Sequence, residues 1–103
     1  MAVDLSLPRE YKRRVESAFG DRVARMVLFG SRARGEEHEE SDWDIAIFLK
    51  DEPTMHDRHQ LSDLGVDLLF DTGQVIQPLA FPLRRQAEES YLMRDIRSDG
   101  IAL

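Results

Sequence analysis

The sequence contains no cysteine. This excludes a disulfide scaffold and any metal site built from thiolates, and it fits a reducing environment, so we expect a cytoplasmic protein. Long hydrophobic runs are also missing: the longest, such as Ile45 to Leu49, are far too short to span a bilayer. The first ten residues, MAVDLSLPRE, lack the basic start and apolar segment of a secretion signal. We therefore expect neither secretion nor a membrane partner.

The chain has fewer basic than acidic residues, and its 103 residues carry a formal net charge of −6. An acidic domain repels a phosphate backbone, which disfavours broad nucleic-acid binding but leaves a small anionic ligand such as a nucleotide possible. The hydrophobic fraction of 42% and the charged fraction of 33% are ordinary for a globular protein. Length and composition together predict that residues 1–103 form a single domain with a modest core.

Hydrophobic periodicity predicts a helix and two strands in the first half of the chain. The helix begins near Ser6-Leu7-Pro8 and ends at Gly20, and Val23–Phe29 is a short buried strand. Trp43–Leu49 alternates as the clearest strand. Its alternation predicts one face made of Trp43, Ile45, Ile47 and Leu49, and the other of Asp42, Asp44, Ala46 and Phe48.

The second half of the chain is less clear. Met55–Thr72 fits a helix that ends at Gly73, although Val66 to Phe70 also alternates as a strand would; we favour the helix. A strand through Val75, Ile76 and Leu79 follows, and Pro78 places it at the edge of a sheet. We expect an amphipathic helix over Leu83 to Arg97, with Ala87, Tyr91, Leu92 and Ile96 facing inward and Gly100 ending it. The alternation of helices and strands predicts an α/β or α+β fold.

Gly30 and Ser31 end the first strand and are followed by a tight helical turn, Ser31 to Gly35. Glycine permits a close backbone approach, the N–H groups at the start of the turn are available, and the serine hydroxyl adds a donor. This pattern predicts a corner that binds an anion.

Asp42 and Asp44 lie at positions i and i+2, so their carboxylates project side by side from one face of the second strand. A hard divalent cation relieves the repulsion between them, and Mg²⁺ or Mn²⁺ prefers such oxygen ligands. Together with the anion corner, the pair predicts a site that holds a nucleoside triphosphate through its phosphates and a metal. Metal and donors would then neutralise charge on the transferring phosphorus and on the leaving pyrophosphate.

Other polar residues leave alternatives open. Arg32 and Arg34 either contact phosphates or pair with the nearby Glu36, Glu37 and Glu39. His56 and His59 have no further ligand at helical spacing, so a solvated helix face is a better interpretation than a metal site. Trp43 points away from the carboxylates in a regular strand, which favours a core position.

Gly30-Ser31, the ten residues 32–41, and Asp42-Trp43-Asp44, within "FGSRARG" and "SDWDI", resemble the signature of the minimal nucleotidyltransferases of the DNA polymerase beta superfamily. The ending "LMRDIRSDGIAL" is similar to stand-alone members. The resemblance implies the nucleotidyltransferase fold, a small mixed sheet flanked by helices. It also implies Mg²⁺-dependent (or Mn²⁺-dependent) transfer of a nucleoside monophosphate, most simply AMP from ATP, to a hydroxyl. Asp42 and Asp44 would be the catalytic, metal-binding residues, and Gly30, Ser31 and Arg32 would bind the nucleotide.

The family usually has a third carboxylate on the next strand. If Val75 to Leu79 is that strand, the matching residue is Gln77; if Val66 to Phe70 is, the residue is Asp67. We favour Gln77, which cannot carry the charge or accept a proton.

The resemblance also implies a protein partner. Stand-alone members commonly occur beside a HEPN-type ribonuclease toxin, which implies an antitoxin that binds this toxin and adenylylates a tyrosine on it. Gln77 favours a second hypothesis, a binding module with a decayed site that neutralises its partner by docking alone. Transfer to a small molecule such as an aminoglycoside is less attractive, because those enzymes usually add a helical domain. Self-association remains open.

Overall fold

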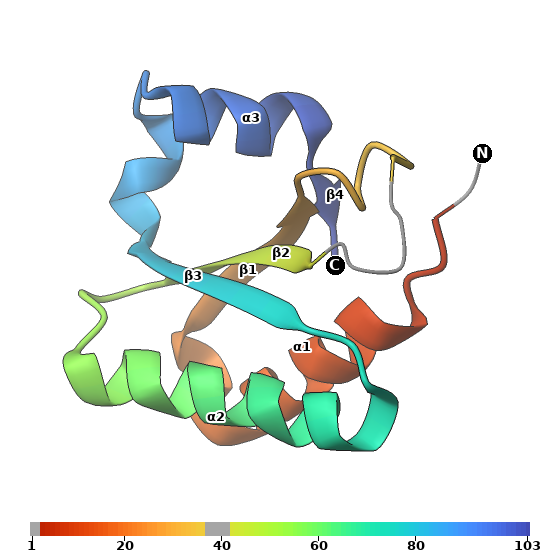
Figure 1. Ribbon diagram of the computed structural model, residues 1–103. Helices are drawn as coiled ribbons and strands as arrows, with labels where there is room; N and C mark the ends of the chain where they lie inside the picture. Colours follow the sequence, from red (N-terminus) through yellow and green to blue (C-terminus); the bar gives the residue numbers. More distant parts are fainter. Residues whose placement is uncertain (1–2, 37–41) are drawn as a thin grey trace.

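The apolar stretches of the sequence form the strands of one sheet, and the amphipathic stretches form helices on both of its faces. The computed structural model describes residues 3–36 and 42–103. Figure 1 shows α1 and α2 together on one face of the sheet and α3 on the other. In chain order the helices and strands are α1 (Ser6–Phe19), β1 (Val23–Phe29), β2 (Trp43–Leu49), α2 (Met55–Thr72), β3 (Ile76–Pro82), α3 (Tyr91–Asp99) and β4 (Ile101–Ala102).

The sheet is mixed, with the strand order β3-β2-β1-β4. β1 pairs antiparallel with β2 and with β4, whereas β2 pairs parallel with β3. Parallel neighbours need a long crossover connection, and α2 provides it. The register places Asp44 beside Phe29 of β1 on one side and beside Gln77 of β3 on the other. The predicted mixed α/β fold is therefore confirmed, with β3 at an edge as Pro78 indicated.

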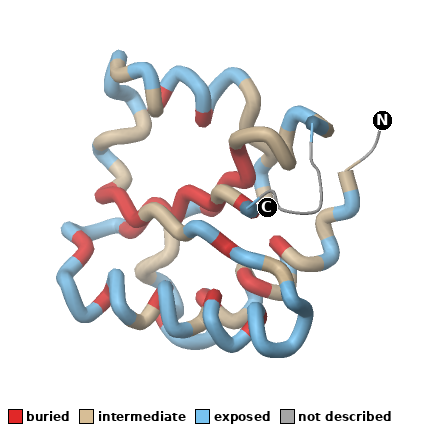
Figure 2. The backbone as a smooth tube through the Cα atoms, viewed as in Figure 1, coloured by how far each residue is buried: buried red, intermediate tan, exposed pale blue. Residues whose placement is uncertain are grey.

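The two faces of β2 separate as the alternation predicted. Trp43, Ile45, Ile47 and Leu49 belong to the core between the sheet and the helices α1 and α2. Ala46 and Phe48 belong to a second apolar cluster, under α3. Figure 2 shows that the buried residues concentrate in the sheet and on the sides of the helices that face it. Asp44 therefore lies on the α3 side of the sheet, because it shares a face with Ala46.

Met55–Thr72, which the sequence left between helix and strand, is the helix α2, and the residues at its two ends stabilise it as a helix. Thr54 accepts a hydrogen bond from the backbone N–H of Asp57, and the Asp57 carboxylate accepts one from the N–H of Thr54, which completes a capping box. Gly73, at φ 75°, ends the helix in the left-handed conformation. Asp57 is buried, and Arg22 donates to it over 2.7 Å from Nη2. These contacts join the start of α2 to the chain just before β1.

The prediction of one helix over Leu83 to Arg97 is wrong. The chain forms a short 3-10 helix, Leu83–Ala87, and begins a new helix only at Tyr91, where Ser90 accepts a hydrogen bond from the N–H of Met93. This restart changes which residues face the sheet. The buried residues of α3 are Met93 and Ile96, whereas Ala87 and Tyr91, expected inside, are exposed.

Among the described residues, no helix has the length and apolarity needed to cross a membrane.

Candidate functional site

The backbone at Gly30 lies directly against the side chain of Asp44. A Cβ atom added to Gly30 would fall 2.3 Å from Oδ2 of Asp44 and 3.2 Å from its Cγ. Gly30 also has a φ of 79°, in the left-handed region that favours glycine. Both features follow from the register, because Phe29 is paired with Asp44 and the chain must turn immediately afterwards. The glycine thus brings the turn onto the carboxylate.

The segment after Gly30 is a single helical turn. The N–H groups of Ala33 and Arg34 both donate to the carbonyl oxygen of Gly30, over 3.1 and 3.2 Å, and the N–H of Glu36 donates to that of Ser31 over 2.9 Å. The amide and hydroxyl of Ser31, at the start of this turn, donate to no described residue. These two groups are the donors that the predicted anion corner would use, and the binding of an anion there remains a prediction.

The two aspartates influence each other electrostatically. Asp44 is partly buried and Asp42 is exposed. Partial burial raises the pKa of Asp44 above its usual value, the negative charge of Asp42 raises it further, and the positive charge of Arg34 opposes this. No described residue donates a hydrogen bond to the Asp44 carboxylate. A cation bound by both carboxylates would remove the repulsion, and their oxygen atoms fit Mg²⁺ or Mn²⁺.

Comparison with known proteins decides the family. A family-wide sequence model described as "Polymerase beta, Nucleotidyltransferase" matches residues 15–102. This chain belongs to that family. The resemblance carried by the Gly-Ser and Asp-x-Asp residues is thereby confirmed, and the sheet that holds them is the one expected for a nucleotidyltransferase.

Individual relatives agree with this assignment. A protein of Methanocaldococcus jannaschii, named as a candidate protein adenylyltransferase, is 29% identical over 77 residues, which cover 75% of this chain and 78% of the relative. A crystal structure of a toxin–antitoxin with AMP-PNP matches with a TM-score of 0.66 at 18% identity, over 90% of this chain and 69% of that one. A complex of a tri-AMPylated HEPN toxin and an MNT antitoxin from Shewanella oneidensis matches with a TM-score of 0.61 at 15% identity, over 96% and 71% of the two chains. At these identities the structures show a shared fold.

Of the two residues considered for a third carboxylate position, Gln77 is the one on a strand beside Asp44. Gln77 is the β3 residue paired with Asp44, and its side chain is exposed. Asp67, the alternative, lies on the exposed side of α2 and does not belong to a strand. Within residues 3–36 and 42–103, no group of three or more acidic, histidine or cysteine side chains is placed to hold a metal ion by itself. The strand beside Asp44 is therefore the one that carries Gln77, and its place as the third-carboxylate position remains a prediction.

The two arginines of the turn point to different parts of the nucleotidyltransferase. The Arg34 guanidinium is paired with Glu36 at 3.0 Å and with Asp99, the last residue of α3, at 3.2 Å. Arg32 stacks over the Trp43 ring, with its Cζ 4.5 Å from the ring centroid. For Arg34 the ion-pair alternative is confirmed in part, since Glu37 and Glu39 lie outside the described residues. A phosphate contact by Arg32 remains a prediction.

Trp43 and Arg32 also line a cavity of about 490 Å³ between the start of α1 and the end of α2. The indole N–H of Trp43 donates to Oε1 of Gln74 over 2.8 Å, and this bond fixes the ring in its core position. The cavity lies on the α1 and α2 side of the sheet, opposite the face that carries Asp44. Trp43 is thus a core residue, as the strand alternation indicated.

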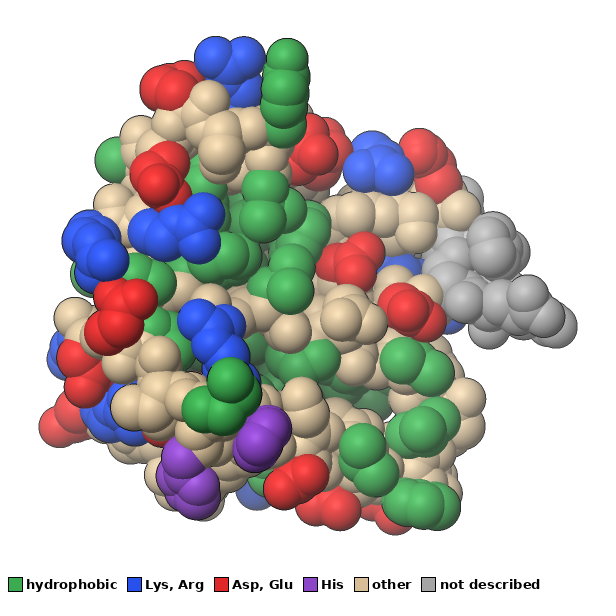
Figure 3. Space-filling view, turned by 60° about the vertical axis from the view of Figure 1, so that its left-hand side comes forward, with side chains coloured by type: hydrophobic (Ala, Val, Ile, Leu, Met, Phe, Trp, Pro, Cys, Tyr) green, Lys and Arg blue, Asp and Glu red, His purple; other side chains and the backbone are tan. Residues whose placement is uncertain are grey.

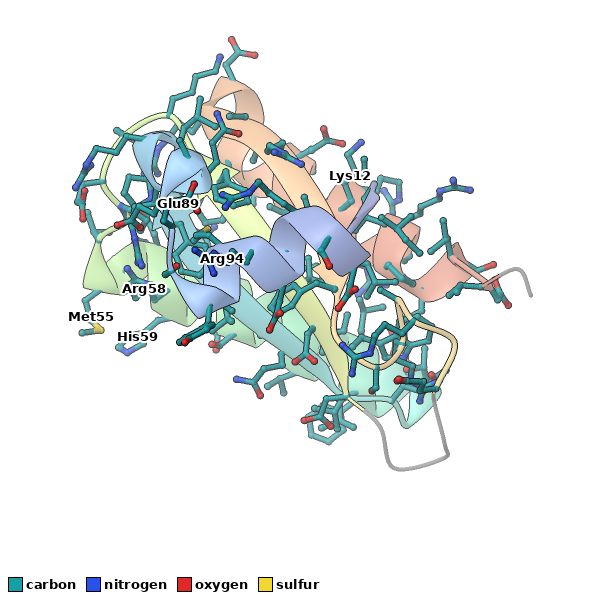
Figure 4. All side chains as sticks on the ribbon, turned by 90° about the horizontal axis from the view of Figure 1, so that it is seen from above. Lys12, Met55, Arg58, His59, Glu89 and Arg94 are labelled. Atoms are coloured by element: carbon teal, nitrogen blue, oxygen red, sulfur yellow. The ribbon has the colours of Figure 1, made fainter. Side chains whose placement is uncertain are left out.

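The two histidines of α2 lie far from the carboxylates. His56 and His59 are both exposed on the first turns of the helix. Figure 4 shows His59 close to Met55 at the start of α2, at the outer margin of the molecule. This is the solvated helix face that the spacing predicted.

Sequence reasoning missed Asp99 at the site. It reaches Arg34 from α3, sixty-five positions further along the chain, and nothing in the sequence signals that pairing. The contact depends on where α3 packs, which the incorrect helix over Leu83 to Arg97 could not indicate.

Proposed function

We propose that this protein transfers AMP from ATP to a hydroxyl group of a partner protein, with Mg²⁺, and that the partner is a HEPN-type toxin. The observation that carries the proposal is the contact of the Gly30 backbone with Asp44, which joins the phosphate-binding turn to the carboxylate pair. A relative named as a protein adenylyltransferase and a fold match to an antitoxin bound to its AMPylated toxin support the choice of AMP and of the partner.

Each residue of the site has a separate role in this reaction. Asp42 and Asp44 would hold the metal, and its chemistry would be to neutralise charge on the triphosphate and on the pyrophosphate that leaves. The amide and hydroxyl of Ser31 hold phosphate oxygens, and Gly30 gives them room to approach. The acceptor oxygen forms a bond to the α-phosphorus as the bond from that phosphorus to the bridging oxygen breaks. The hydroxyl proton passes to solvent, because the amide of Gln77 cannot accept it.

The test is transfer of label from α-labelled ATP, in the presence of Mg²⁺, to the purified protein product of the neighbouring gene. We expect the wild-type chain to label that protein, and both Asp42→Asn and Asp44→Asn to reduce labelling at least a hundredfold. Asp21→Asn is the matched control, because Asp21 is an exposed aspartate in the 3-10 helix η1 (Gly20–Arg22), next to β1. An unlabelled partner with the wild-type chain, or undiminished labelling with either variant, would contradict the proposal.

A second function, neutralisation by docking alone, is favoured by one observation: Gln77 at the position of the third acid. The Asp42→Asn, Asp44→Asn double variant separates the two. Under the docking hypothesis this variant still relieves the toxicity of the partner in cells. Under the transferase proposal, relief of toxicity is lost although the complex still forms.

A further inference from the structure

Four apolar side chains are exposed together around the end of α2. Val66 is 44% exposed, Leu69 37%, Phe70 85%, and Val75, in the turn before β3, 40%. Val66, Leu69 and Phe70 follow at helical spacing, so they share one face of α2. We call these four residues the α2 patch. Figure 3 shows hydrophobic side chains gathered at the lower right of the view, above acidic side chains at its lower margin. Contiguous exposed apolar surface of this kind marks an interaction site more often than a single exposed residue does.

The α2 patch is hollowed where it meets β3. A groove of about 180 Å³ lies between α2 and β3, and Val66, Leu69 and Val75 line it together with Gln77 and Pro78. Gln77 is the residue paired with Asp44. Asp44 itself lies on the α3 side of the sheet, so a partner seated in this groove would reach the carboxylates around the free edge of β3, at Gln77.

The free edge of β3 cannot take an added strand, so a partner must dock through side chains. The carbonyl of Val75 accepts from the N–H of Trp43, so alternate residues from Val75 onward face β2 and the others face outward. The outward residues include Pro78 and Pro82, which have no N–H, and Ala80, whose carbonyl accepts from Arg58 over 3.0 Å. Proline and a covering side chain are known means of blocking an edge.

Charge around the α2 patch indicates what kind of segment fits. Asp63 and Asp67 precede Val66 and Phe70 by three residues each, so they border the patch on the helix surface. Both are exposed, and neither has an ion-pair partner in the described part of the chain. Two copies of the chain that met through this patch would bring these carboxylates toward one another, whereas lysine or arginine on another protein would pair with them.

We propose that the α2 patch is the docking surface for the protein partner that brings the acceptor hydroxyl, and that it receives an apolar side chain flanked by lysine or arginine. This inference rests on the proposed function. It adds that the partner is held beside Gln77, by side-chain contacts to α2, and that binding is weakened by salt.

The test measures the affinity of the purified partner for the full chain by calorimetry, separately from AMP transfer. We expect the double variant Val66→Ser, Phe70→Ser to weaken binding at least tenfold, and Asp63→Lys, Asp67→Lys to weaken it at low salt. Tyr91→Ser is the matched control, because Tyr91 is 86% exposed on α3, on the other face of the sheet. Folding of each variant is checked by its thermal unfolding, and the site by the stabilisation that ATP and Mg²⁺ provide.

The outcomes separate this inference from the proposed function. If the patch variants bind the partner as tightly as Tyr91→Ser does, the docking surface is elsewhere and the inference fails, whether or not AMP is transferred. If they change only self-association in sedimentation experiments, the patch joins copies of the chain and the inference also fails. If binding depends on the patch but no AMP is transferred, the docking surface stands and the transferase proposal is the one that fails.

Discussion

Replacing Gly30 with alanine tests the contact that holds the site together. The substitution has two separate costs. Alanine at φ 79° is in the left-handed region, which costs about 1–2 kcal/mol relative to glycine. Its Cβ would also lie 2.3 Å from Oδ2 of Asp44, more than 1 Å closer than an ordinary contact, which begins at 3.4 Å. Overpacking of this kind costs about 1–3 kcal/mol if the carboxylate stays in place.

The Asp44 carboxylate can instead rotate away from the new Cβ atom. The variant then keeps its stability but binds the ligand more weakly. Displacement of a reacting group by about 1 Å can reduce activity on the order of a hundredfold. Gly30→Ala should therefore lose at least one of two properties, stability or the thermal stabilisation given by ATP and Mg²⁺. Urea unfolding and thermal-shift titration measure both on the same samples.

Gly35→Ala is the matched control for this prediction. Gly35 has a φ of 74°, and nothing lies within 4 Å of the position its Cβ would take, so the variant carries only the conformational cost. A double-mutant cycle measures the free energy of the clash separately. In an Asp44→Ala background, Gly30→Ala should lower the free energy of unfolding by no more than Gly35→Ala does. Equal losses of stability and of nucleotide binding for Gly30→Ala and Gly35→Ala in the wild-type background would refute the reasoning.

Three further predictions concern charge and packing. The pKa of Asp44 is raised in the folded state, so its ionised form destabilises the fold. In the absence of metal, Asp44→Asn should therefore raise the melting temperature at pH 7. This gain should vanish near pH 3, below the unfolded pKa of about 3.9, where the carboxylate is protonated in both states. Arg22 lowers the pKa of Asp57, so Asp57→Asn should cost about 2–3 kcal/mol at pH 7 in urea unfolding, and the difference from wild type should narrow as pH falls below about 4. Gly100→Ala should destabilise by about 1–3 kcal/mol despite an ordinary φ, because its Cβ would lie 2.5 Å from Cγ1 of Val27; thermal unfolding beside Gly35→Ala checks this.

Local patterns were enough to predict most of the fold. β1 and β2 are short apolar runs between clear breaks, and α2 is a segment bounded by a capping residue and a left-handed glycine. The helix over Leu83 to Arg97 failed for a reason that lies outside the segment's own periodicity. Nη1 of Arg97 donates to the carbonyls of Gln86 and Glu88, over 2.7 and 3.0 Å, and so holds the bend between the 3-10 helix and α3. Apolar spacing carries no information about such a bond.

The candidate site was predicted by the resemblance rather than by local patterns. The resemblance grouped Gly30 with Asp44, and the order of strands in the structure then placed Gln77, not Asp67, beside Asp44. The pairing of Arg34 with Asp99 depends on how α3 packs, and the stacking of Arg32 on Trp43 depends on side-chain packing across the sheet. These contacts arise from tertiary structure, which one sequence without a template does not give.

A comparison of two aspartates explains why the carboxylate pair is better understood as a binding site than as part of the scaffold. Asp57 is more deeply buried than Asp44, but Arg22 and Thr54 supply donors, so its ionised form is favoured and its pKa falls. Asp44 receives no such donors from the described residues, and the charge beside it is that of another carboxylate, so its pKa rises. A structural carboxylate is retained because it stabilises the fold. A carboxylate whose ionised form is disfavoured by its surroundings, and which lies against the turn at Gly30, has the environment of a group that binds a cation.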